Sequence, residues 1–234
     1  MTQSMLIYRE VPEYRAGRAG TLLGLHGRGG TLDQLLPLSQ EAAPSFRVVM
    51  PQAARPITPT SHGYVLEEDG FSWYLGQDFD RPEPATFGES LWQVEQFLYD
   101  LEDQQSRKQP IFLVGYGQGA VLTLSMAGVA PESLAGVAGI CGCLPEIRGW
   151  SPPMATLDGL PVLLVYDPDD IDVPSRSVRK TAEQLVERKA MLDLRSVPGA
   201  RQDPRRAAGA LRDWIGIHMA EISSESHALG LAFS

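Results

Sequence analysis

The stretch IFLVGYGQGAVLTLSMA, residues 111–127, decides the fold of this chain. A short apolar run, IFLVG, predicts a buried strand, and the small-residue run GAVLTLSMAGV after it predicts a helix. Between them, GYGQG has the frame G-x-S-x-G, in which a sharp strand-to-helix turn presents a nucleophilic serine. Glycine, Gly117, stands at the serine position. A plain glycine-rich turn would fit this stretch equally well, so the surrounding sequence has to decide between the two interpretations.

Working outward from this stretch, short apolar runs alternate with segments of helical period. The predicted strands are 4–11, 21–26, 46–52, 111–115, 134–141, 161–167 and 191–197. The predicted helices are 31–43 (interrupted by Pro37), 89–105, 119–129, 175–190 and 204–222. This alternation predicts an α/β fold with a mostly parallel central sheet and helices on both faces. We expect one domain over 1–222 and a C-terminal tail over 223–234.

Composition narrows the class of protein. With 234 residues the chain is long enough for one sizeable core, and its 43% hydrophobic content is typical of a globular domain. A net charge of −9 argues against a nucleic-acid partner. No apolar run is long enough to span a membrane. The start, MTQSMLIYREVPEY, lacks the features of a signal peptide, so we expect a cytoplasmic protein.

Seven landmarks raise the probability that GYGQG is a nucleophile elbow. They are LLGLHGRGGTLDQLLPL, VVMPQA, GFSWY, GYGQGAVLTLSMA, ICGCLP, PVLLVYDPDDIDVP and VPGARQDPRRAAGALRDWI. In order and spacing they resemble the phospholipase/carboxylesterase family of the α/β-hydrolase superfamily, from about Thr21 to Ile215. The resemblance implies an α/β-hydrolase fold. It also implies kinship with carboxylesterases of small substrates and with acyl-protein thioesterases.

The resemblance assigns roles to single positions. The family's elbow, G-F-S-Q-G-G, places its nucleophile at Gly117, and its V-L-L-V-H-G-x-x-D-x-V-V-P segment places its acid at Asp170. The family's G-G-H lies on residues 199–201, so Arg201 replaces the general base. The oxyanion donors would be the main-chain amides of Arg28 and Gln118, and both can still donate because neither residue is proline.

Two more residues lie at family landmarks near the expected cleft. His26 belongs to the H-G turn, and we interpret it as structural. Trp73, in GFSWY, matches a family aromatic; packing is its favoured role, and a place in the pocket wall is the alternative. The segment 53–87 has no clear period, and we expect it to form part of the pocket wall.

The substitutions remove two chemical functions. Glycine has no side chain with which to attack an ester, and arginine cannot accept a proton at neutral pH. We therefore expect a catalytically impaired protein that acts through ligand or partner binding. The alternative is an active carboxylic ester or thioester hydrolase with a rearranged site. Substitute groups considered for such a site are Tyr116, Ser125, Cys141, Cys143 and the histidines His62, His218 and His227.

What remains of the site suits an anion. We expect an ion pair between Arg201 and Asp170, with a bidentate geometry as one form of it. The two amides, Arg28 and the first turn of the following helix would favour a small anionic or acyl ligand. No cofactor is expected, and no metal either, since DPDDID lacks the spacing and glycine of a calcium loop. A homodimer is a further alternative.

Overall fold

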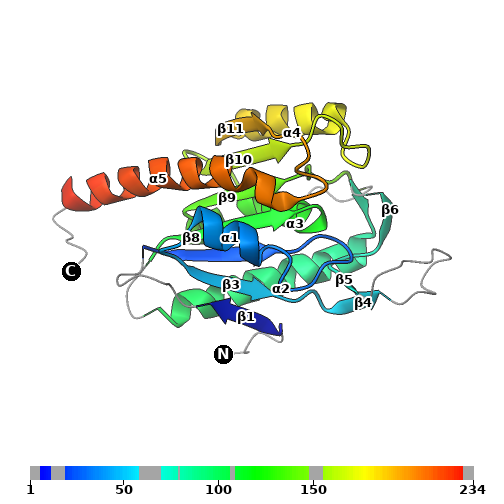
Figure 1. The fold of residues 1–234 in the computed structure, drawn as a ribbon, viewed down its shortest axis with the longest axis horizontal. Coiled ribbons are helices and arrows are strands. Elements are labelled where there is room, and N and C mark those ends of the chain that lie inside the picture. Colours follow the sequence, from blue (N-terminus) through cyan, green and yellow to red (C-terminus); the bar gives the residue numbers. More distant parts are fainter. Residues whose placement is uncertain are drawn as a thin grey trace.

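The centre of the structure is a seven-stranded sheet (Figure 1). The computed structural model describes residues 6–11, 19–57, 70–78, 80–105, 109–147 and 155–228. The strand order is β1-β3-β2-β8-β9-β10-β11; β1 runs antiparallel to β3, and the other neighbours are parallel. The strands are β1 (Tyr8–Val11), β2 (Thr21–Leu25), β3 (Arg47–Pro51), β8 (Ile111–Tyr116), β9 (Gly136–Ile140), β10 (Pro161–Tyr166) and β11 (Met191–Ser196). The predicted, mostly parallel sheet is confirmed.

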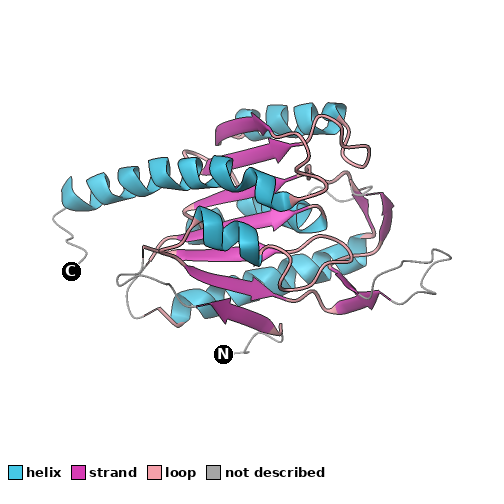
Figure 2. Cartoon of the chain, viewed as in Figure 1, coloured by secondary structure: helices cyan, strands magenta, loops and turns pink. Residues whose placement is uncertain are grey.

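Helices cover both faces of this sheet (Figure 2). One hydrophobic cluster lies between the sheet and α1 and α5, and a second lies between the sheet and α2, α3 and α4. The helices are α1 (Leu36–Ala42), α2 (Pro84–Asp103), α3 (Gln118–Val129), α4 (Ser175–Glu187) and α5 (Ala208–Ala228), with short 3-10 turns η2 (Pro131–Ser133) and η3 (Pro204–Ala207).

Burial on both faces explains the continuous apolar runs in the sequence. Every residue of β8 is buried. Successive side chains of a strand point to opposite faces, and accordingly Leu113 belongs to one hydrophobic cluster while Phe112 and Val114 belong to the other. Because both faces are buried, neither requires polar side chains, and apolar and polar residues do not alternate along the strand.

The parallel strands bring distant segments of the chain to one edge of the sheet. The loops that leave β2, β8, β9, β10 and β11 all follow the carboxyl ends of parallel strands, where open α/β sheets bind ligands. The residues predicted to form the site lie in or close to these loops. The fold therefore places them at the same edge.

Three predicted boundaries were wrong. Pro37 lies in the first turn of α1 and begins the helix instead of interrupting it, since a first-turn residue needs no N–H donor. Helix α2 begins at Pro84, where the Glu83 side chain accepts from the first-turn amides. Helix α5 continues to Ala228, beyond the predicted end of the last helix at residue 222.

The segment 53–87 contains short strands that the sequence did not reveal. β4 (Arg55–Ile57) pairs with β5 (Gly70–Ser72), and β6 (Gly76–Asp78) pairs with β7 (Arg81–Pro82), both antiparallel. Strands this short carry too few residues to show a period of two. Residues 58–69 and 79, and with them much of the expected pocket wall and His62, lie outside the described residues.

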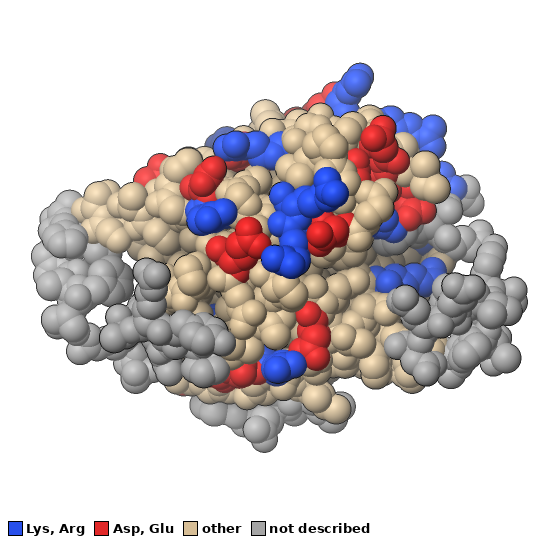
Figure 3. Space-filling view, viewed as in Figure 1, with Lys and Arg blue, Asp and Glu red and all other residues tan. Residues whose placement is uncertain are grey.

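Two properties concern the partners expected from the sequence: the distribution of charge on the surface and the hydropathy of the helices. On the face that carries α1 and α5, acidic and basic side chains lie interspersed over the described residues (Figure 3). Among those same residues, no helix combines the length and apolar character required to cross a bilayer.

Candidate active site

The GYGQG segment forms a one-residue turn between strand and helix. β8 ends at Tyr116 and α3 begins at Gln118, with Gly117 between them at φ 54° and ψ −116°. The Gly117 N–H donates to the Ile140 carbonyl at 3.0 Å, which ties the turn to β9. A residue with a side chain would be strained in this conformation, at roughly 1–3 kcal/mol. The geometry is that of the predicted elbow, with only hydrogen at its apex.

The flanking glycines allow the strand and the helix to approach closely. A Cβ atom on Gly115 would lie 2.2 Å from the Gly119 carbonyl oxygen. A Cβ atom on Gly119 would lie 2.1 Å from the Leu25 carbonyl oxygen. Both distances are far inside van der Waals contact with rigid backbone. The elbow therefore requires small residues at both flanks, as the sequence indicated.

The Gln118 side chain joins the elbow to the GFSWY segment. Its Oε1 accepts from the main-chain N–H of Trp73 at 3.0 Å and from the Ser72 hydroxyl at 3.1 Å. Its Nε2 donates to the Tyr74 carbonyl at 2.8 Å. The side chain is buried, and both its oxygen and its nitrogen form hydrogen bonds within the chain. This structural role was not predicted from the sequence.

The two expected oxyanion donors are main-chain amides. Neither the Arg28 amide nor the Gln118 amide donates a hydrogen bond to another residue within the described ranges. The Arg28 side chain is exposed beside the turn that follows β2. Both amides are thus available to an acceptor from outside the chain.

His26 and Trp73 are structural in this fold. The His26 Nδ1–H donates to the Gly27 carbonyl at 2.7 Å, and Nε2 accepts from the Ala53 N–H at 3.0 Å. These partners define a neutral ring, and burial lowers the pKa of His26 to about 4. The Trp73 indole donates to the His26 carbonyl at 2.8 Å and is fully buried. Trp73 therefore packs under the β2 turn and does not face an open pocket.

Asp170 is a buried carboxylate with one unsatisfied oxygen. Its Oδ1 accepts from the main-chain N–H groups of Asp172 at 2.9 Å and of Val173 at 3.1 Å. Its Oδ2 is buried and has no hydrogen-bond partner among the described residues. The acid is thus held in place by its own turn, and its second oxygen is oriented toward no donor.

Arg201 divides its guanidinium between two carboxylates. Its Nη2 donates to Asp172 Oδ2, and its Nε lies 3.8 Å from Asp170 Oδ1. The predicted ion pair with Asp170 therefore forms, but the bidentate geometry is wrong, and Asp172 is the hydrogen-bonded partner. An arginine side chain is longer than a histidine side chain, so the Arg201 guanidinium extends past Asp170 to the partly exposed carboxylate of Asp172. The Arg201 side chain is 19% exposed.

The groups closest to the elbow are poor substitutes for a serine. The Tyr116 hydroxyl donates to the Arg201 carbonyl at 2.5 Å, and burial raises the pKa of this phenol. Burial also raises the pKa of Cys141 and of Cys143 to about 12, so both thiols are protonated at neutral pH. None of these three groups is activated as a nucleophile.

The remaining candidates lie inside helices or outside the described residues. The Ser125 hydroxyl donates to the Val121 carbonyl at 2.8 Å and is buried within α3. His218 lies on α5 and contacts Glu221 at 2.7 Å. The side chains of His62 and His227 are not among those described. No group of three or more metal-ligating side chains occurs in the described part of the chain.

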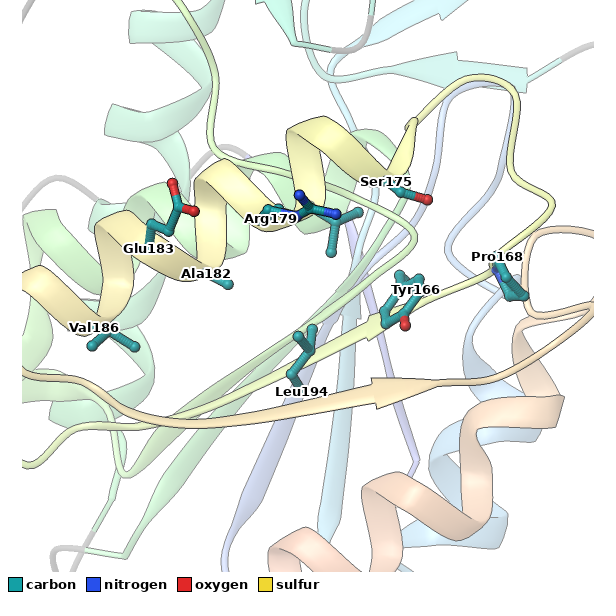
Figure 4. Close-up of a pocket in the computed structure, with 9 residues that line it drawn as sticks. Tyr166, Pro168, Ser175, Arg179, Ala182, Glu183, Val186 and Leu194 are labelled. Carbon is teal, nitrogen blue, oxygen red and sulfur yellow. The ribbon is translucent and has the colours of Figure 1, made fainter.

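A groove of about 590 Å³ lies beside the Asp170 loop (Figure 4). It runs between α4 and the ends of β10 and β11, and none of the predicted site residues lines it. Arg179, Glu183 and Val186 border it from α4, opposite Leu194 of β11. No pattern in the sequence indicates this groove, because the groove depends on how far α4 lies from the sheet.

The comparisons with known proteins identify the family. Residues 8–218 match the phospholipase/carboxylesterase family. The chain belongs to this family. Among curated proteins, a sequence search finds no match.

Solved structures similar to this chain share the α/β-hydrolase fold of the family. A carboxylesterase from Mesorhizobium loti is 22% identical, with a TM-score of 0.76 over 92% of this chain and 97% of its own. YahD, determined with malic acid, is 19% identical, with a TM-score of 0.74 over 92% and 100%. A Bacillus cereus carboxylesterase is 18% identical, with a TM-score of 0.69 over 89% and 95%.

Proposed function

We propose that this phospholipase/carboxylesterase-family chain has lost serine-hydrolase chemistry and acts by binding a small anionic or acyl ligand. At the family's nucleophile position Gly117 offers only hydrogen, and at the base position the Arg201 guanidinium keeps its proton at neutral pH. The cysteines and the tyrosine close to the elbow are protonated and buried, so they do not replace the missing groups.

The observation that carries the proposal is the buried Asp170 carboxylate. In a catalytic triad the acid accepts a hydrogen bond from the ring N–H of the histidine and fixes its orientation. Within the described residues nothing donates to Asp170 Oδ2, and Arg201 approaches the other oxygen from 3.8 Å. Among the described residues the acid thus has no imidazole to orient, and none of them stands ready to take a proton from an attacking group.

Activity-based labelling tests the loss of chemistry. The wild type, Gly117→Ser, Arg201→His and the double variant are exposed to a fluorophosphonate probe and to a p-nitrophenyl ester. We expect no labelling or turnover of the wild type and little from either single variant, because nucleophile and base act as a unit. The double variant should turn over at least about 10²-fold faster than the wild type.

The control for this experiment is the double variant Gly117→Ala/Arg201→His, which restores the base without a nucleophile. It should behave as the wild type does. Labelling of the wild type that disappears on changing one residue would contradict the proposal and identify the rearranged nucleophile of an active hydrolase.

The ligand part of the proposal rests on the donors that surround the apex. The amides of Arg28 and Gln118, the first turn of α3 and the exposed Arg28 guanidinium together favour a negatively charged group. YahD, whose structure was determined with malic acid, supports small carboxylates as first probes. Arg201 contributes less, since its charge is already balanced by Asp170 and Asp172.

Thermal shift measures this binding. Malate, butyrate and phosphate are titrated against the wild type, with sodium chloride at equal ionic strength as the reference. Ligand at 100-fold its Kd stabilises the folded state by about 2.7 kcal/mol, which raises the Tm. Arg28→Ala should reduce the shift, while Arg212→Ala, an exposed change on α5, should not. If both variants show equal Tm shifts, Arg28 is not part of the binding site. If none of the anions shifts the Tm of the wild type, the binding proposal is contradicted.

A further inference from the structure

The outer edge of β11 is an exposed, unpaired strand edge. β11 is the last strand of the sheet, and no described residue pairs with its outer side (Figure 1). Two large hydrophobic side chains on it are open to solvent, with Met191 47% and Leu194 45% exposed. Natural proteins usually protect such an edge with charges, proline or a covering element, because it can pair with another strand.

The backbone of β11 is arranged to accept a partner. The N–H groups of Met191 and Val197 donate to carbonyls of Leu160 and Tyr166, both toward β10. Because direction alternates along a strand, residues 192, 194 and 196 direct their N–H and C=O groups toward the open side. An antiparallel partner could exchange paired hydrogen bonds with these three residues.

The charges on β11 select one register for a second copy of the strand. A two-fold axis at Leu194 places Leu194 opposite its equivalent and 192 opposite 196, so that outward-directed residues pair with each other. Within each strand Arg195 already donates to Asp193, at 2.7 and 2.8 Å. The same axis places this pair opposite its equivalent, so that Asp193 of each copy faces Arg195 of the other. An axis at Asp193 would oppose two aspartates, and an axis at Arg195 would oppose two arginines, which is unfavourable.

Helix α4 adds a second self-complementary layer on the same side. Its Arg179 and Glu183 are exposed and line the groove, which Val186, 59% exposed, and Leu194 also line (Figure 4). A two-fold axis perpendicular to β11 runs two copies of α4 antiparallel. The turn with Arg179 in one helix then lies toward the turn with Glu183 in the other. The apolar side chains at the groove, Val186 and Leu194, are covered by the second copy.

We propose that a second copy of this chain occupies this surface, with β11 pairing antiparallel to β11 about Leu194 and α4 facing α4. The sheet then continues from one subunit into the next. The strand leads directly into the turn that carries Arg201, so each candidate site lies close to the subunit contact. The inference goes beyond the proposed function and does not depend on it.

Sedimentation equilibrium of the full chain, from about 1 to 100 µM, tests the dimer and its register. The wild type should be dimeric. Asp193→Arg or Arg195→Asp alone should weaken association about tenfold, because each creates like-charged pairs at both symmetric positions. The double swap should restore it, because the opposite charges face each other again. Melting curves of each variant separate weakened association from loss of folding.

A cysteine at the axis tests the geometry independently. Hydrogen-bonded antiparallel pairs hold their Cα atoms about 5.5 Å apart, which a disulfide can bridge. Leu194→Cys should therefore form a covalent dimer on mild oxidation, whereas Trp92→Cys, an exposed position on α2, should not. A monomer at every concentration, or a dimer that neither reversal weakens and Leu194→Cys does not cross-link, would overturn the proposal.

Discussion

The two halves of the candidate site differ in how completely their polar groups are satisfied. On the elbow half, the polar atoms of the Gln118 and His26 side chains form hydrogen bonds within the chain, and Trp73 is buried beside them. On the acid–base half, Asp170 buries an oxygen that has no hydrogen-bond partner among the described residues, and Arg201 divides its charge between two carboxylates.

The difference shows which parts of a hydrolase site are structural in their own right. The elbow is stabilised by backbone approach and by the residues beneath it, so it keeps its shape when its serine is absent. On the acid–base half, no described residue donates to the second oxygen of Asp170. The rest of the fold tolerates this unsatisfied group.

The largest effect should come from the backbone approach at the elbow. Gly119→Ala places a Cβ 2.1 Å from the Leu25 carbonyl oxygen, and no change of rotamer relieves a clash with backbone. We expect a loss of at least about 4 kcal/mol of unfolding free energy, or no folded protein. Urea unfolding measures it. Gly88→Ala, in α2 with open space around it, should instead stabilise by about 0.5–1 kcal/mol. Comparable stability of the two variants would contradict the close approach.

Removing the Gln118 side chain should have the next largest effect. Gln118→Ala leaves the buried Trp73 N–H without its acceptor, and it removes one donor from the Tyr74 carbonyl, which still accepts from the Ser72 hydroxyl. An unsatisfied buried group costs about 1–3 kcal/mol, so a loss of unfolding free energy in that range is expected. The matched control is Gln93→Ala on α2, since Gln93 Oε1 has no hydrogen-bond partner among the described residues. Equal losses would mean that the Gln118 contacts contribute no stability.

His26 makes the elbow half sensitive to acid. Its pKa is about 4 in the folded chain and 6.5 for an unperturbed histidine, so protonation favours the unfolded state. The stability from the neutral ring is complete above pH 6.5 and falls between pH 6.5 and 4, by about 1.4 kcal/mol per pH unit. Unfolding free energies of the wild type and His26→Gln, compared across this range, isolate the effect. Parallel pH profiles would contradict it.

The smallest effect should come from the exposed partner of Arg201. Asp172→Ala removes a salt bridge whose carboxylate is 42% exposed, so it should cost less than about 1 kcal/mol. Asp170→Ala should cost more, about 1–3 kcal/mol, because the buried Val173 N–H and the part-buried Asp172 N–H lose their acceptor. Chemical denaturation of both variants gives the ranking. The reverse order would mean that the acid–base half is held by the surface pair.

Much of the fold followed from the sequence, and so did the placement of the predicted site residues at one edge of the sheet, while their roles remain predictions. The apolar runs predicted the strands of the central sheet because strands covered on both faces need no polar side chains. The elbow and the loops of Asp170 and Arg201 followed from the order of landmarks, since each landmark closes a strand at the same edge.

The features that the sequence did not predict depend on contacts between residues that lie far apart in the chain. Nothing in GYGQG shows that the Gln118 side chain reaches Trp73, 45 residues away in sequence. DPDDID offers several carboxylates, and only the position of the chain in space shows that Asp172 hydrogen-bonds Arg201. The short strands of 53–87 and the groove beside α4 depend in the same way on tertiary packing.

The unsatisfied oxygen of Asp170 has a consequence for how such sequences diverge. Where catalysis does not preserve it, Asp170 is kept for the two main-chain hydrogen bonds of its turn and for the ion pair with Arg201. Asparagine or serine can also accept the hydrogen bonds of the turn, whereas Gln118 has no such substitute. Among sequences with glycine at the apex, residue 170 should therefore vary among aspartate, asparagine and serine more than residue 118 varies.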